Sequence, residues 1–146
     1  MASLSPLIEE VIKSGNNAEL TVFGTSMEPF LLHGVSRVRL SKVENLTNGD
    51  VVLYRRDSGA YVLHRIVAIK NGFYTMCGDN QCVLEHGIRR DQILAVMIAF
   101  SRDGSEWNDS SEIAYKTYRV LWMRSRFARR VFRGVKWRID RVLRKI

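Results

Sequence analysis

Between residues 19 and 100 the sequence consists of short runs rich in β-branched and aromatic residues, separated by glycine, asparagine, aspartate or serine. This alternation is typical of strands joined by turns, because branched and aromatic side chains favour an extended backbone. Asn71-Gly72 is a strong signal for a two-residue hairpin turn. Little helical sequence lies between the runs, so the pattern predicts a mainly β, compact antiparallel domain. The expected strands are residues 19–23, 36–40, 51–55, 61–69, 73–76 and 93–100.

The two ends of the chain differ from this β-rich region. Residues 5–14 are amphipathic, with Pro6 at the favoured first helical position and Gly15 after the last turn, so they predict a short helix. Residues 101–111 are polar, and from residue 112 the apolar residues recur with a helical period. We therefore expect an N-terminal helix (1–17), a β domain (18–100), a polar connector (101–111) and a helical tail (112–146).

Charge is distributed unevenly along the chain. The formal net charge is +8, but residues 112–146 hold 12 Lys or Arg and only 2 Asp or Glu, so the excess belongs to the tail. The tail is predicted to be a long basic amphipathic helix that meets an acidic partner. An anionic membrane surface is the favoured partner, and nucleic acid, an acidic protein or packing on the domain are the alternatives. The residues expected to face the partner are Arg126, Arg129, Arg130, Arg133 and Trp137.

Several classes of protein are disfavoured by what the sequence lacks. No uninterrupted apolar run approaches the roughly 18 residues of a membrane-spanning helix, and the N-terminus has neither a basic start nor a long apolar segment. We therefore predict a cytoplasmic protein that is peripheral at a membrane at most. Cys77 and Cys82 are too few for a disulfide framework, and with His86 they lack a fourth ligand and the usual zinc spacing. We therefore expect both cysteines to be thiols, and we expect the protein to need neither a metal nor a cofactor.

Residues 24–29 (Gly-Thr-Ser-Met-Glu-Pro) contain the first candidate for chemistry. A serine on a glycine-containing turn, shortly before a proline, is held out of regular structure, so its hydroxyl can be exposed and its N–H can face an oxyanion. Such a serine is a weak nucleophile and needs a base within hydrogen-bond reach. Ser26 is therefore a candidate nucleophile, and the alternative is a turn serine that caps a local N–H.

The candidate base is His64, which with Arg65 forms a polar pair inside an otherwise apolar strand. Neighbouring residues of a strand point to opposite faces, so these two side chains cannot share one. The ordinary pKa of imidazole suits a general base near neutral pH. The alternative is a half-buried histidine satisfied by a backbone carbonyl.

Four motifs follow one another in the chain: Ser-Met-Glu-Pro at 26–29, Gly-Asp-Val-Val at 49–52, His-Arg-Ile-Val at 64–67 and Gly-Asp-Asn at 78–80. In this order they resemble the signal peptidase family, in its archaeal and endoplasmic-reticulum-type branch. In that branch a histidine stands where bacterial signal peptidases and self-cleaving phage-type repressors carry a lysine. The resemblance covers residues 18–100 and implies a signal-peptidase-like or repressor-peptidase-like β fold.

By position, the resemblance implies Ser26 as nucleophile, His64 as general base and Asp79 as the acid that supports His64. A second acid of the family falls on Glu85, so the third member of the site stays open. Met27 is implied to line the pocket for a small substrate side chain.

The chain also departs from the family. Gly24 stands where many signal peptidases carry a hydroxyl donor, so the oxyanion site is expected to use backbone N–H groups or Thr25. The family's N-terminal membrane anchor is not expected here, and the basic tail is no part of the common core.

The predicted function is that of a serine endopeptidase that cleaves a leader or precursor peptide with a Ser–His dyad. One alternative is a peptide-binding relative that cleaves nothing. The other is a repressor-like regulatory protein whose basic tail binds membrane or nucleic acid.

Overall fold

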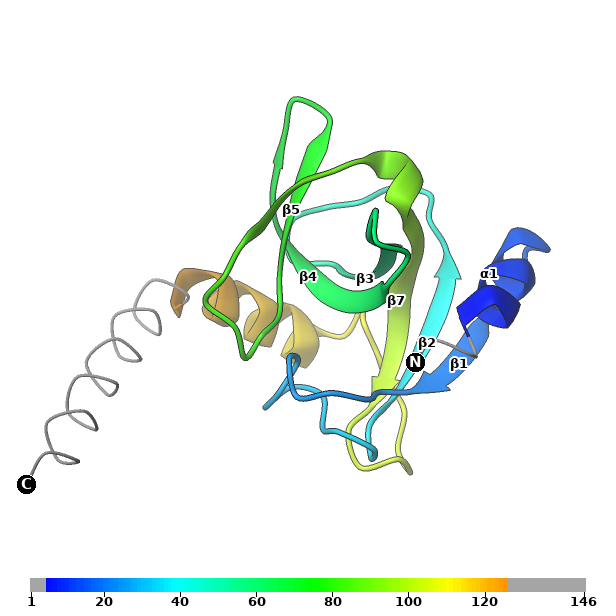
Figure 1. Cartoon of the computed structure of the whole chain (residues 1–146). Helices are drawn as coiled ribbons and strands as arrows, with labels where there is room; N and C mark the ends of the chain where they lie inside the picture. The colour runs from blue at the N-terminus through cyan, green and yellow to red at the C-terminus, as the bar shows by residue number, and fades with distance from the viewer. Residues whose placement is uncertain (1–4, 126–146) are drawn as a thin grey trace, which may run out of the picture.

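The computed structural model of the chain describes residues 5–125. One antiparallel sheet dominates it, with a short helix at the N-terminal end and a second helix, residues 113–125, at the C-terminal end of the described part (Figure 1). The elements are α1 (Ser5–Lys13), β1 (Ala18–Thr21), β2 (Arg37–Lys42), β3 (Val51–Arg55), β4 (Tyr61–Lys70), β5 (Phe73–Cys77), β6 (Glu85–Ile88), η1 (Arg90–Gln92), β7 (Ile93–Ser101) and β8 (Asn108–Asp109).

All strand pairs are antiparallel, and the order across the sheet is β1-β2-β7-β3-β4-β5-β6, with β8 paired to β7. The prediction of a mainly β, antiparallel fold is confirmed. The β4–β5 hairpin turns at Asn71 and Gly72, which both have positive φ (53° and 77°). A two-residue type I′ turn requires positive φ at both central positions, which explains this strong sequence signal.

Buried apolar residues pack on both faces of the sheet, and β4 contributes to both. Leu63 belongs to one core cluster, with Val51 and Leu53 of the neighbouring strand. Ile66 belongs to another, with Tyr54. His64 is paired with Val52 and therefore lies on the Tyr54 side, whereas Arg65 points the opposite way. The side chains of His64 and Arg65 therefore lie on opposite faces of the sheet and have different neighbours.

The ends of the described chain agree in part with the expectations. Helix α1 forms as predicted and packs on the core through Ile12. The expected polar connector contains a further strand, β8, because Asn108 and Asp109 pair with β7. Within residues 5–125 no helix is long and apolar enough to cross a membrane.

The predicted tail helix is described only as far as residue 125. The residues assigned to its partner face, Arg126, Arg129, Arg130, Arg133 and Trp137, lie outside the described residues.

Candidate active site

The Ser26 turn follows β1 and leaves the sheet at Gly24, where a φ of 98° favours a residue without a side chain. Met27 is buried in the core cluster and anchors the turn from inside, whereas Ser26 is half-buried and Thr25 is exposed. Within residues 5–125, no hydrogen bond uses the backbone N–H of Ser26. The turn therefore offers both a hydroxyl and an N–H donor. That Met27 lines a substrate pocket stays a prediction.

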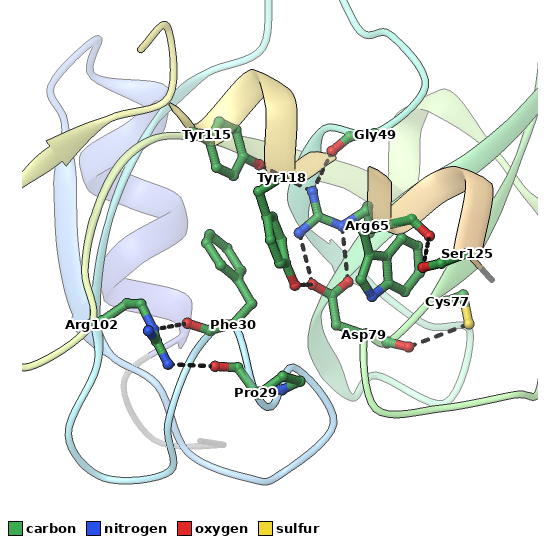
Figure 2. A network of polar contacts seen from close by, with 12 residues as sticks. Pro29, Phe30, Gly49, Arg65, Cys77, Asp79, Arg102, Tyr115, Tyr118 and Ser125 are labelled. Atoms are coloured by element: carbon green, nitrogen blue, oxygen red, sulfur yellow. Dashed lines mark hydrogen bonds and ion pairs between the residues drawn. The ribbon is translucent and has the colours of Figure 1, made fainter. Parts of the chain in front are cut away.

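The loop after β5 holds this turn in place. The backbone N–H of Asn80 donates to the carbonyl oxygen of Ser26 at 2.8 Å, and the Asn80 side-chain amide donates to the carbonyl of Thr25 at 3.0 Å. On the far side of the turn, Arg102 donates to the carbonyls of Pro29 and Phe30 (Figure 2). Contacts from two distant parts of the chain thus position Ser26.

Gly78 brings the serine turn and His64 together. A Cβ atom added to this glycine would lie 2.5 Å from the Ser26 carbonyl oxygen and 3.1 Å from Nε2 of His64. The Ser26 carbonyl and the His64 ring therefore approach the same side of Gly78. Only a residue without a side chain leaves room for both. The structure thus brings the backbone of Ser26 and the ring of His64 to the same glycine, while within residues 5–125 no hydrogen bond joins the Ser26 hydroxyl to His64.

The other ring nitrogen of His64 faces Tyr54. The Tyr54 hydroxyl lies 3.4 Å from His64 Nδ1 and donates to the Glu85 carboxylate, at 3.0 Å and 3.1 Å from its two oxygens. A tyrosine hydroxyl has one proton, and a carboxylate can only accept. With that proton given to Glu85, the hydroxyl oxygen accepts from His64 Nδ1–H. This tautomer leaves Nε2, the nitrogen near Ser26, unprotonated.

Burial and charge set the protonation states of the His64, Tyr54 and Glu85 side chains. His64 is 4% exposed, and burial lowers its pKa to about 4, although the charge of Glu85 acts in the opposite direction. Burial also raises the pKa of the Tyr54 hydroxyl, so it keeps its proton. Burial alone would raise the pKa of Glu85, but hydrogen bonds from Arg56 and Tyr54 bring it below its ordinary value. At neutral pH the site holds a neutral imidazole beside a charged carboxylate.

Asp79, expected to support His64, acts through its charge to raise the pKa of that imidazole and makes side-chain contacts with Arg65 and Tyr118. Its carboxylate forms a fully buried, two-pronged ion pair with the Arg65 guanidinium, at 2.9 Å and 2.8 Å, and accepts from Tyr118 at 3.2 Å. A guanidinium matches a carboxylate in shape and charge and is a stronger partner than a neutral imidazole. Of the two acids left open by the sequence, Glu85 is linked to His64 through the Tyr54 hydroxyl, and the charges of both acids raise the pKa of the imidazole.

Arg65 itself occupies an aromatic cage that sequence reasoning missed (Figure 2). Its guanidinium lies 5.3–5.9 Å from four ring centroids and donates to the carbonyl of Gly49 at 2.7 Å and the hydroxyl of Tyr115 at 3.1 Å. The rings belong to Phe30, Tyr115, Tyr118 and Trp122. Three of these four come from helix 113–125, so the cage fixes this helix to the site loop.

The candidate metal ligands and the two cysteines can also be located in the structure. Within residues 5–125, no group of three His, Cys, Asp or Glu side chains is arranged to hold a metal ion. Cys77 is buried and Cys82 is half-buried, and no disulfide joins them.

No family model matches the chain, and no curated protein matches it significantly. The chemistry of the site is therefore inferred from its own residues. These are a turn hydroxyl, a neutral imidazole and a tyrosine–carboxylate pair behind that imidazole.

Proposed function

We propose that this chain is a serine peptidase in which Ser26 is the nucleophile and His64 is the general base. The observation that carries the proposal is the meeting of the Ser26 turn and His64 Nε2 around Gly78. A serine needs a base of suitable protonation state in reach, and this imidazole is neutral at physiological pH. The four ordered motifs, which resemble signal peptidases, support the same assignment.

The proposed reaction is acyl transfer. His64 Nε2 removes the proton of the Ser26 hydroxyl while Oγ attacks a peptide carbonyl, and the backbone N–H of Ser26 faces the developing oxyanion, with Thr25 beside it. The protonated imidazole then gives its proton to the leaving amine. Water, activated by the same imidazole, hydrolyses the acyl-enzyme and regenerates the serine.

Tyr54 and Glu85 support this cycle from behind the ring. When His64 takes up a proton, the positive charge lies one hydroxyl away from the Glu85 carboxylate, which favours the imidazolium. The hydroxyl also keeps Nδ1 protonated, so that Nε2 is the nitrogen that reacts. Asp79 is assigned a structural role, since Arg65 occupies its carboxylate.

A leader or precursor peptide is the proposed substrate class, as the resemblance to signal peptidases implies. The cytoplasmic placement expected from the sequence stays a prediction.

Labelling with a serine-reactive probe tests the mechanism directly. We expect the probe to label the wild-type chain, and Ser26→Ala and His64→Ala each to lose at least about 1,000-fold in labelling and peptide cleavage. Matched controls are Ser58→Ala, in an exposed turn, and His86→Ala, on the exposed side of β6, and both should behave as wild type. Circular dichroism checks that all four variants are folded.

Two results would count against the proposal. Labelling that survives Ser26→Ala would place the nucleophile elsewhere. A wild-type chain that binds peptides from a library but neither cleaves them nor reacts with the probe would be a non-catalytic relative.

A further inference from the structure

Helix 113–125 has two unlike faces. On the inner face Tyr115 and Trp122 are buried, and Arg119 donates to Asp50 at 2.9 Å. On the opposite face Ile113 and Val120, two turns apart, are 82% and 50% exposed. Leu121, at the margin of that face, is 61% exposed.

The charges on this outer face are all of one sign. Lys116 and Arg124 are exposed and flank the apolar side chains at helical spacing. Residues 113–125 contain three Lys or Arg and no Asp or Glu. The outer face therefore combines aliphatic side chains with positive charge and has no acidic residue to neutralise it.

We infer that the outer face of helix 113–125 docks on an anionic lipid surface. Single exposed aliphatic residues are ordinary on proteins, but three on one docked helix, together with basic residues, match a helix that lies in the membrane interface. Nucleic acid fits less well, because phosphates would engage the basic side chains and leave Ile113 and Val120 in water.

The inner face of helix 113–125 is connected to the loop that holds the Ser26 turn. Tyr118 holds Asp79, and the next residue, Asn80, holds the Ser26 turn. A lipid surface under the helix would thus sit at a fixed position relative to the proposed active site. The docking itself does not rest on the proposed function, since it follows from the exposed face alone.

Vesicle binding of the full chain tests the inference. We expect co-sedimentation with vesicles of phosphatidylcholine and phosphatidylglycerol, and weak binding to phosphatidylcholine alone. Ile113→Ser combined with Val120→Ser should weaken binding at least about tenfold, because transfer of both side chains to lipid is lost. Lys116→Gln combined with Arg124→Gln should weaken binding and reduce its sensitivity to salt.

The matched control is Leu7→Ser combined with Val11→Ser, which removes two exposed aliphatic side chains from α1 and should leave binding unchanged. The inference fails if the wild-type chain does not bind anionic vesicles, or if the Ile113 and Val120 changes have no effect. It also fails if double-stranded DNA or an acidic protein binds more tightly than these vesicles. Probe labelling without vesicles reports on Ser26 separately, so the two proposals can fail independently.

Discussion

The imidazole of His64 lies between a glycine on one side and a tyrosine hydroxyl on the other. Burial makes the neutral ring the stable form, and the Tyr54–Glu85 pair selects which nitrogen carries the proton. At the scale of single residues, the proposed base His64 therefore depends on a neighbour that never touches the reacting atoms. In the proposed mechanism Tyr54 is a positioning residue.

Replacing Tyr54 by Phe tests that role. The change keeps the ring that fills the core but removes the hydroxyl between His64 Nδ1 and Glu85. We expect kcat to fall about tenfold with little change in KM, because the base is misaligned while substrate binding is not touched. Steady-state kinetics on a cleaved peptide measures both values.

The control is Tyr61→Phe, which removes a hydroxyl bonded to Glu9 at 3.0 Å, outside the site. It should leave both constants unchanged. Equal losses of kcat in the two variants would mean that Tyr54 acts only through general stability.

Sequence patterns identify some residues of the site and miss others for a physical reason. Ser26 and His64 stand in motifs whose residue types suit the proposed chemistry, so the sequence could name them as candidates. Tyr54 and Gly78 act through the register of β3 with β4 and the path of the loop after β5. Neither the register nor the loop path can be obtained from residue types along one chain.

At the scale of elements, the buried ion pair of Arg65 and Asp79 joins β4, the loop after β5 and helix 113–125. Both side chains are fully buried. Removing one charge of a buried pair leaves the other without compensation in a medium of low polarity, which costs far more than the loss of a surface pair.

Asp79→Asn should therefore lower the free energy of unfolding by about 3–5 kcal/mol, measured by urea denaturation. Arg65→Met combined with Asp79→Leu should recover at least half of this loss, because no charge stays buried. The matched control is Glu19→Gln, which weakens the two ion pairs of Glu19 at an exposed position, with Arg37 at 3.0 Å and with Arg39 at 2.6 Å. It should cost less than about 1 kcal/mol.

The same variants separate structure from catalysis at Asp79. If the double variant is folded and still reacts with a serine-directed probe, the carboxylate is structural. A folded double variant without labelling would instead restore Asp79 to the catalytic group.

The elements themselves were predictable to different degrees. Alternating β-branched runs and the Asn71-Gly72 turn predict β4 and β5 because local backbone preference is strong there. Strands β6 and β8 were missed, since Glu85–Ile88 contains a glycine and two polar residues and β8 has only two residues. Pairing with β5 and β7 determines these strands, and such long-range contacts leave no local pattern.

At the scale of the whole molecule, His64 couples protonation to folding. Its pKa is about 4 in the folded chain and returns to about 6.5 when the ring is exposed to water. Between these values the unfolded chain binds a proton that the folded chain does not, so the free energy of unfolding falls as the pH falls. Above pH 6.5 the ring is neutral in both states, and below pH 4 it is protonated in both, so its contribution is constant outside this window.

Integrated from pH 7 to pH 5, this linkage predicts a loss of about 2 kcal/mol from the free energy of unfolding. Urea denaturation at half-unit pH steps measures it, and the range ends above the pH at which carboxylates begin to titrate in the unfolded chain. His64→Gln should remove most of the decline, since glutamine does not titrate. His86→Gln, which removes an exposed histidine and keeps His64, should retain it. Parallel declines in His64→Gln and wild type would show that other groups carry the acid sensitivity.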